Sequence, residues 1–192
     1  MIARTHDLAA ITALGVIFIL LPPQSLSLAT LIIAVLANLL GGITPDIDQP
    51  TAPLWRNLPI GSFFGRIFGK LLGGHRFFTH SIIGVAVIAY LAHLLLLFLQ
   101  PIMGSVNIDV VWWAFVIGIL SHLVMDTFTK EGVPWLLPIP IKFGIPPVRA
   151  WRITTDKKIE NWIIFPGLLL FNCWFYFLYY DRVIELLRSV TR

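Results

Sequence analysis

Histidine and aspartate side chains recur at the ends of apolar segments in this sequence. In the stretch GILSHLVMDTF, His122 and Asp126 lie four residues apart near the end of one such segment. In a helix this spacing places both side chains on one face. Ionisable groups inside an apolar segment are costly unless they are paired or bound, so they indicate a functional site. The structural alternative is a His–Asp pair that only ties helices together.

Three further stretches carry the same residue types: RTHD, with His6 and Asp7; TPDIDQP, with Asp46 and Asp48; and GGHRFFTHS, with His75 and His80. Imidazole and carboxylate are the ligand types that zinc, manganese and iron prefer. We therefore expect a divalent metal site for one or two ions, with zinc as the expected metal; coincidental grouping is the alternative. His93 is an internal comparison, because it lies roughly 20 Å from His80 along a helix.

The candidate residues can be given separate roles. The expected metal ligands are His6, Asp46, His75, His80, His122 and Asp126. One metal on His80, His122 and Asp126 would keep an open position for water, and a second would use His6 and one of the two TPDID aspartates, with Asp126 bridging. Either aspartate can be the ligand; we expect Asp46 to bind metal and Asp48 to be the general base.

Two charged residues nearby are weaker candidates. Arg76 is placed in sequence to contact an anionic phosphate through a forked pair of hydrogen bonds, and its alternative role is that of a charge that orients the chain in a membrane. Glu160, at the start of the last apolar segment, is a possible ligand, with capping or ordinary surface charge as the alternative.

Composition identifies the class of protein. Of 192 residues, 57% are hydrophobic and only 12% are charged, and the mean hydropathy is +0.84, which is typical of an integral membrane protein. No linker or repeat divides the chain, so residues 1–192 are expected to form a single membrane-embedded domain. Lys and Arg lie between the apolar segments, where membrane orientation explains the net charge of +4, so nucleic acid is not expected as a partner.

Five apolar segments are predicted as transmembrane or membrane-embedded helices: Leu8–Leu21, Ser27–Ile43, Ser81–Phe98, Ile108–Phe128 and Trp162–Tyr180. Spanning the hydrocarbon core takes about 20 residues, so the first two are short. Pro22 and Pro23 predict a tight hairpin turn between those two. The first segment is alternatively a signal peptide. The expected fold is an all-α integral membrane protein.

Basic residues predict the orientation in the membrane. They occur before the first segment and in the two long connections 44–80 and 129–161, whereas the other two connections have no Lys or Arg. By the positive-inside rule, the amino terminus and both long connections face the cytoplasm, and the expected metal site lies with them. The tail with Arg182, Arg188 and Arg192 then falls outside, unless the fifth segment lies on the membrane or re-enters it.

Two stretches beside the expected site have their own patterns. In GSFFGRIFGKLLGG, apolar residues such as Phe64 and Phe68 share a helical face opposite Arg66 and Lys70, which predicts an interfacial amphipathic helix. Its glycines recur every four residues, which would allow close packing on a transmembrane helix. The proline-rich stretch VPWLLPIPIKFGIPPVRAWR is predicted to cover the site as a re-entrant or surface-lying segment.

The stretches THDLAA, TPDIDQP, HRFFTHS and SHLVMDTFTKEGVPWLLP together resemble the family of LexA-regulated, inner-membrane, metal-dependent hydrolases, from His6 to about Pro140. More distantly, the order His, Asp, His and His-x-x-x-Asp is similar to the zinc-dependent phospholipase C and P1 nuclease group. That group's further histidine and His-x-x-x-Glu pair have no match after Asp126, which leaves its third metal position and its phosphodiester chemistry without matching residues.

The expected function is therefore metal-dependent hydrolysis of an ester or phosphoester in a lipid or other membrane-associated substrate, at the cytoplasmic face of the inner membrane. A metal-ion transporter or permease with the same ligands is the main alternative, and a scaffold with a closed structural metal is another. Membrane lipids are the expected partners. The sequence indicates neither the substrate nor the oligomeric state.

Overall fold

The protein is built from helices. The computed structural model describes residues 1–74, 76–139 and 141–190, and within these ranges it has no strand, only two isolated β-bridges. Five helices are long and apolar enough to cross a membrane: α1 (Ala3–Leu20), α2 (Leu28–Ile43) with the 3-10 turn η1 (Thr44–Asp48), α5 (Ile82–Met103), α6 (Ile108–Thr127), and the π-helical η4 (Glu160–Ile164) with α7 (Phe165–Leu178). The predicted all-α membrane architecture is confirmed.

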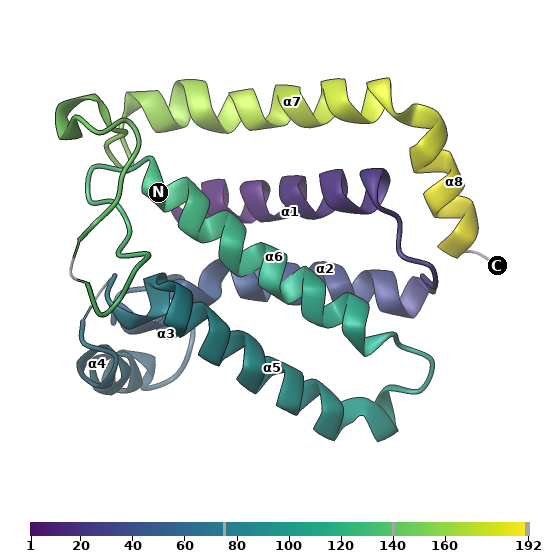
Figure 1. The fold of residues 1–192 in the computed structure, drawn as a ribbon, viewed down its shortest axis with the longest axis horizontal. Helices are drawn as coiled ribbons and strands as arrows, with labels where there is room; N and C mark the ends of the chain where they lie inside the picture. Colours follow the sequence, from purple (N-terminus) through teal and green to yellow (C-terminus); the bar gives the residue numbers. More distant parts are fainter. Residues whose placement is uncertain (75, 140, 191–192) are drawn as a thin grey trace.

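Helix α6 lies at the centre of this bundle. It contacts α1, α2 and α5, whereas α7 packs on α1 at the far side (Figure 1). Half of the α6 span is buried, compared with 17% for α5 and 6% for the span that contains α7. Helices α5 and α7 therefore leave most of their apolar surface to the surrounding lipid, as flanking helices of a membrane bundle do.

The closest helix crossing is between α2 and α6, and it depends on glycine. A methyl group at Gly41 would overlap the carbonyl oxygen of Phe115, and one at Gly118 would overlap that of Asn38. The side chain of Asn38 is buried here and donates a hydrogen bond to the carbonyl of Ala114 (3.0 Å). Small residues let helix backbones approach closely in membranes. This crossing brings the carboxyl end of α2 against α6 one turn after Gly118.

The variant Gly118→Ala is expected to destabilise the protein by about 1–3 kcal/mol, because the added methyl forces α2 and α6 apart. The matched control is Gly167→Ala on α7, where an added methyl would meet nothing within 4 Å. Thermal unfolding midpoints of the two variants in detergent test this. Equal midpoints would contradict the importance of the close crossing.

Two helix boundaries differ clearly from those predicted, and one helix was not predicted. Helix α1 begins at Ala3 rather than Leu8, because its polar residues Thr5 and His6 are buried against neighbouring helices rather than left in a loop. Helix α5 continues beyond Phe98 to Met103. Helix α8 (Tyr180–Val190) was not predicted; it follows α7 and lies across the end of the bundle near the α1–α2 turn (Figure 1).

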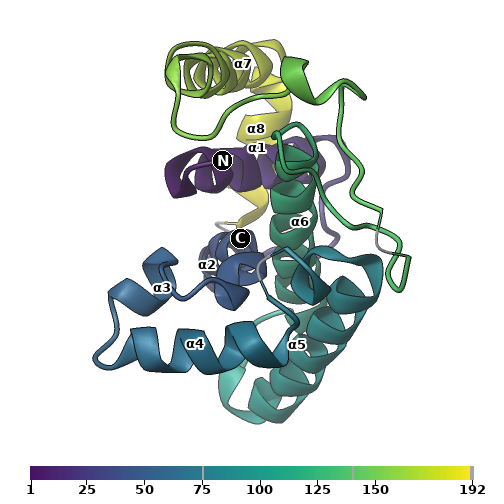
Figure 2. The same ribbon diagram turned by 90° about the vertical axis from the view of Figure 1, so that its left-hand side faces the viewer.

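The predicted interfacial helix is present as α4 (Gly61–Leu71), which follows the short α3 (Pro53–Arg56). Its glycine face is buried, but not against a transmembrane helix: Gly61 and Gly65 face Trp55, and Gly69 faces the backbone of Asp48. That packing prediction was wrong, because the glycine period reveals a small face without revealing its partner. The aromatic face of α4 is exposed, on the side of the molecule seen in Figure 2.

The long connection after α6 lies across one end of the bundle (Figure 1). It is irregular apart from the short turn η3 (Arg149–Trp151), and it is held by backbone hydrogen bonds to the helix ends. The carbonyl of Trp135 accepts from Ile82 at the start of α5, and the carbonyl of Thr127 accepts from Ile145. The stretch predicted to cover the site therefore lies beside the amino end of α5 and the carboxyl end of α6, where the candidate residues gather.

Candidate metal centre

The candidate residues meet at one end of the bundle, although they come from four separate elements. His6 lies in the first turn of α1 and Asp46 in η1, at the end of α2. His80 lies in the turn η2 (Phe78–His80), just before α5, and His122 and Asp126 lie in the last two turns of α6. The predicted convergence of helix ends is thus present in the fold.

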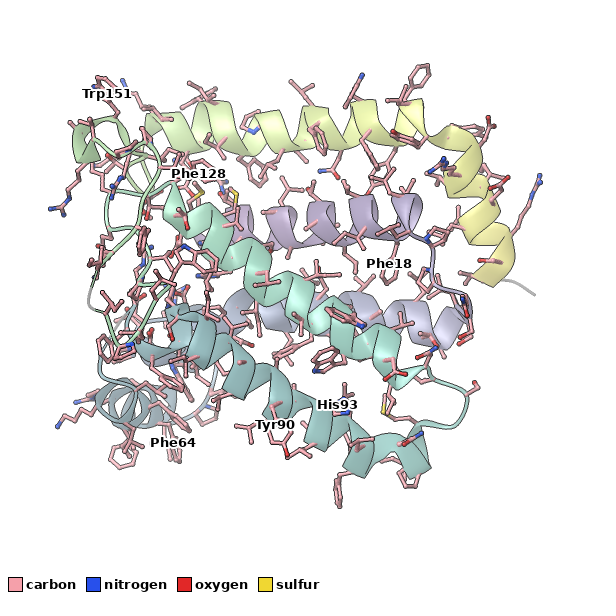
Figure 3. All side chains as sticks on the ribbon, in the orientation of Figure 1. Phe18, Phe64, Tyr90, His93, Phe128 and Trp151 are labelled. Atoms are coloured by element: carbon pink, nitrogen blue, oxygen red, sulfur yellow. The ribbon has the colours of Figure 1, made fainter. Side chains whose placement is uncertain are left out.

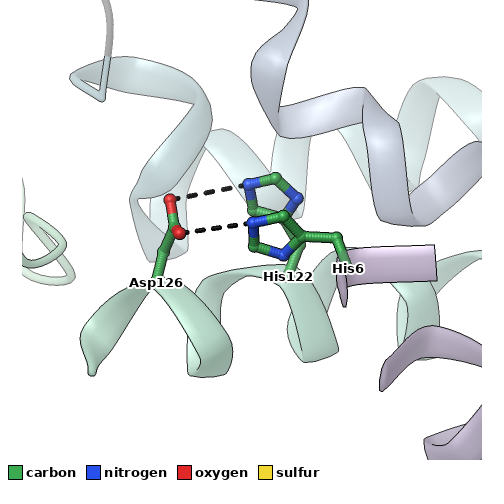
Figure 4. Close-up of side chains that lie close together, drawn as sticks. All are labelled: His6, His122 and Asp126. Carbon is green, nitrogen blue, oxygen red and sulfur yellow. Dashed lines mark ion pairs between the residues drawn. The ribbon is translucent and has the colours of Figure 1, made fainter. Parts of the chain in front are cut away.

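Asp126 is the centre of the cluster and is only 1% exposed. Its Oδ1 lies 3.3 Å from Nε2 of His6, and its Oδ2 lies 3.7 Å from Nε2 of both His80 and His122. The rings of His6 and His122 are stacked 3.8 Å apart, with both directed at the carboxylate (Figure 4). The amino group of Met1 also lies 2.8 Å from Oδ1.

A second carboxylate, Asp46, completes the cluster. Its Oδ1 lies 3.7 Å from Nε2 of His122 and 4.0 Å from Nε2 of His80. Two groups of three ligand-type residues result, one of His6, His122 and Asp126 and one of Asp46, His80 and His122. Ligand atoms around a tetrahedral zinc at roughly 2.0–2.1 Å lie about 3.3–3.4 Å apart, so a small inward movement would bring either group to coordination distance.

The orientation of His122 is set by a backbone carbonyl. Its Nδ1 lies 2.6 Å from the oxygen of Gly42. Because a carbonyl only accepts, Nδ1 carries the proton and the lone pair of Nε2 points into the cluster. This Nε2 is buried and makes no hydrogen bond within the described part of the chain. A buried nitrogen that faces two carboxylates without a hydrogen bond fits a metal ligand.

His80 is oriented in the same way by a side-chain relay. The hydroxyl of Thr79 donates to Oδ2 of Asp48 (2.6 Å) and lies 2.9 Å from Nδ1 of His80. Since the single hydroxyl hydrogen goes to Asp48, the Thr79 oxygen accepts from Nδ1, and Nε2 of His80 faces Asp46 and Asp126. Burial lowers the pKa of His80, but the nearby carboxylates Asp126 and Asp48 raise it more, so the net pKa lies above its ordinary value.

The two aspartates of TPDID face different surroundings. Asp48 is buried, and its Oδ2 also accepts from the backbone N–H of Arg76 (2.9 Å). It therefore lies on the Nδ1 side of His80, behind the nitrogen that faces the cluster. Asp46 faces the cluster directly and is 23% exposed, so water reaches it. Asp48 was predicted as the general base, and this role stays a prediction.

Arg76 is buried beside Asp126 rather than placed at the surface. Its Nη2 lies 2.5 Å from Oδ2 of Asp126, and its Nη1 donates to Oγ1 of Thr129 (2.8 Å). Its backbone has a positive φ of 56°, which is uncommon for a side chain of this size. In this arrangement the guanidinium compensates the charge of the buried carboxylate. The predicted phosphate contact would require it to share its N–H groups between Asp126 and a ligand.

A small cavity lies beside the cluster. Its volume is about 10 Å³, and its walls include His6, Asp46 and His122 together with Gly42. A cavity of roughly this size holds one water molecule. The Nε2 of His122, which makes no hydrogen bond within the described residues, the spacing of the ligand atoms and this cavity together fit a divalent metal ion with a bound water molecule.

Of the remaining candidates, Glu160 and His93 lie apart from the two ligand groups. His75 lies outside the described residues. Glu160 is buried rather than on the surface, and it accepts backbone hydrogen bonds from Ile2 (2.8 Å) and Asp156 (2.7 Å), as a capping residue does. His93 lies on α5, far along that helix from the cluster (Figure 3). Its ring contacts Trp112 of α6.

Sequence reasoning did not identify the groups that orient the histidines. Thr79 precedes His80 in the sequence, so its position beside a candidate ligand was a usable signal. The carbonyl of Gly42 offered none, because a backbone acceptor carries no sequence signature.

Comparison with known proteins gives a family but no activity. A 144-residue match to "Uncharacterized protein YvsG" of Bacillus subtilis is 27% identical and covers 74% of this chain and 78% of that protein. "Inner membrane protein YdjM" of Escherichia coli is 36% identical over 109 residues, or 54% of this chain, and the match spans 48% of its length. "Inner membrane protein YbcI" of the same organism is 30% identical over 56% of this chain and 68% of that protein.

The names of the two Escherichia coli proteins state a location in the inner membrane. None of the three names mentions hydrolysis, LexA or phospholipase C. No solved structure matches the chain. The family described as "YdjM inner membrane protein" matches residues 1–184, which include all five membrane-spanning helices and both candidate ligand groups. The chain therefore belongs to the YdjM family of inner membrane proteins.

Proposed function

We propose that this protein is a membrane-bound, metal-dependent hydrolase that cleaves an ester or phosphoester of a membrane lipid or another membrane-associated substrate. The observation that carries the proposal is the cluster of His6, His80, His122 and Asp126 with Asp46 beside it, in which the buried Nε2 of His122 makes no hydrogen bond within the described residues. Imidazole and carboxylate donors in this number favour zinc, in one or two ions.

The residues of the cluster have different roles in this proposal. His6, His80, His122 and Asp126 would hold a divalent metal, and the Gly42 carbonyl and the Thr79–Asp48 relay fix the directions of two of these histidines. A bound divalent metal lowers the pKa of water at the site and polarises the bond to be cleaved. Asp46, the cluster carboxylate that solvent reaches, accepts the proton of the attacking water.

This proposal departs from the roles expected from sequence, in which Asp46 was a metal ligand and Asp48 the general base. Asp48 becomes a positioning residue, because its Oδ2 is already hydrogen-bonded to Thr79 and Arg76 on the far side of His80. Arg76 holds Asp126 in place and balances its charge. Its Nη1 lies toward Glu131, which is more than half exposed, so an anionic substrate group that approaches from solvent would meet the guanidinium there.

The position of the cluster supports hydrolysis over transport. A transporter site typically lies near the middle of the membrane, where it can open to both sides. Here the ligands lie in the terminal turns of α1 and α6 and in the turns η1 and η2, at one end of the bundle. An enzyme that acts at the headgroup level needs its metal at such an end.

The test is metal analysis of the purified protein together with turnover on a panel of phospholipids and small phosphoesters. We expect one or two equivalents of zinc and metal-dependent release of product from at least one lipid. Stoichiometric metal without turnover on any substrate would favour the structural scaffold, and metal uptake into sealed vesicles would favour the transporter.

The cluster is expected to face the cytoplasm, since both long basic connections lie at its end of the bundle. In a Cys173→Ala background, Lys157→Cys should react with an impermeant thiol reagent only from the cytoplasmic side. Ser105→Cys, at the opposite end, should react only from the periplasmic side. Both positions are exposed. Reversed labelling would place the chemistry on the periplasmic face.

A further inference from the structure

An apolar groove of about 580 Å³ lies between α5 and α6. Its walls are formed by Val85, Ala86 and Ala89 of α5 and by Val116 and Leu120 of α6. Ligand sites in proteins commonly have volumes of roughly 300–1,000 Å³. The groove is therefore large enough for a substantial apolar molecule, and the catalytic roles above do not use it.

We propose that this groove binds one acyl chain of the phospholipid whose ester or phosphoester lies at the metal centre. The headgroup end of this proposal rests on the proposed function. The acyl chain itself follows from position: both walls are membrane-spanning helices, and the rim residues Tyr90 and Trp113 are mostly exposed to the bilayer. Lipid chains are the apolar molecules that surround such a groove, and they gain close contacts inside it.

One end of the groove lies close in sequence to residues of the candidate metal centre. Its near end is formed by Ile82, two residues after His80, and by Trp135 of the long connection. The indole of Trp135 donates to Oγ1 of Thr127 (3.0 Å), next to Asp126, and the Trp135 carbonyl accepts from the backbone of Ile82 (3.0 Å). These bonds fix the near end of the groove beside two residues that face the metal site.

The far end of the groove is lined by polar and aromatic groups, Asp109 among them. The indole of Trp112 donates to the carbonyl of Ala89 (2.7 Å), and its ring contacts His93. From Ile82 to His93 the helix rises roughly 16 Å, about half the thickness of the hydrocarbon core. An acyl chain that enters beside the metal centre can thus lie along α5 as far as Trp112. His93 lines the groove at that end.

The test uses protein reconstituted in phosphatidylethanolamine and phosphatidylglycerol vesicles that contain a phospholipid with a photoreactive diazirine in its acyl chain. After illumination, mass spectrometry maps the labelled residues. We expect the label to concentrate on Ala86, Ala89 and Val116. Leu91 and Leu95, which are exposed on α5 but do not line the groove, should be labelled much less.

Two tryptophan variants make the test specific. Ala86→Trp fills the groove from an exposed position and should abolish the label there, whereas Val87→Trp, on the same helix but outside the groove, should preserve it. Metal content should stay unchanged in both. Label spread evenly over α5, label unaffected by Ala86→Trp, or crosslinks to a second copy through the groove would each overturn the proposal.

The experiment can contradict the acyl-chain site and the proposed hydrolase function independently of each other. Concentrated groove labelling in a protein that hydrolyses no lipid supports the acyl-chain site and counts against the proposed function. Lipid hydrolysis with evenly spread labelling overturns the groove and leaves the function standing.

Discussion

Replacing His122 by alanine is expected to remove bound metal from the purified protein and to reduce hydrolysis to background. The Nε2 atom of His122 belongs to both groups of ligand-type residues, so its loss breaks both at once. Removing a residue that only orients a ligand typically lowers metal affinity by about 10- to 100-fold. Loss of a shared ligand should exceed that range. Metal content and turnover, measured on the same preparation, test the prediction.

The matched control is His93→Ala, which removes the same residue type from α5. The ring of His93 contacts Trp112 and takes no part in either ligand group, so metal content should stay at the wild-type level. Thermal midpoints of both variants show whether the fold survives. A folded His122→Ala protein that retains full metal and turnover would contradict the proposed centre.

The convergence of the ligands could be predicted because it depends only on the order of the segments. Successive membrane crossings bring every second connection to the same face, and the basic residues identify which connections those are. His6, Asp46, His80 and Asp126 all flank or end segments on that face. Sequence therefore predicted which residues would gather, without any knowledge of how the helices pack.

The separate roles of the gathered residues could not be predicted in the same way. Asp48 turns away from the cluster because Thr79 and the backbone of Arg76, both distant in sequence, hydrogen-bond to it. Arg76 donates that bond from a left-handed backbone conformation, which no residue pattern near it indicates. Long-range contacts of this kind determine which of two neighbouring carboxylates faces the histidine cluster.

The surfaces that pack against the glycine faces could not be predicted from the sequence either. The glycine period of α4 correctly indicated a face for close contact, but the surface that it meets comes from Pro50 and Trp55 rather than from a transmembrane helix. The crossing of α2 and α6 uses Gly41 and Gly118, which belong to no regular repeat. It nevertheless brings the Gly42 carbonyl to His122 and so fixes the orientation of a ligand.

The variants Asp46→Asn and Asp48→Asn are expected to have different defects, the first in turnover and the second in metal affinity. Asp46→Asn should lower turnover by roughly 10² or more with smaller loss of metal, because an amide cannot accept the proton of water as a general base does. Asp48→Asn should lower metal affinity by about 10- to 100-fold, because the amide no longer offers Thr79 and Arg76 a charged acceptor, and the relay to His80 weakens. Its turnover should recover when metal is added to saturation.

Metal titration and turnover at saturating metal, measured for both variants, separate these outcomes. Asp48→Asn that keeps its metal and loses turnover, together with Asp46→Asn that loses its metal, would show that Asp48 is the base and Asp46 the ligand. The solvent exposure of Asp46 would then not indicate the base. Wild-type turnover in both variants would remove the base and the Asp46 group together. The remaining group of His6, His122 and Asp126 would then describe a structural metal site, closed by Arg76 and suited to holding the ends of α1 and α6 together.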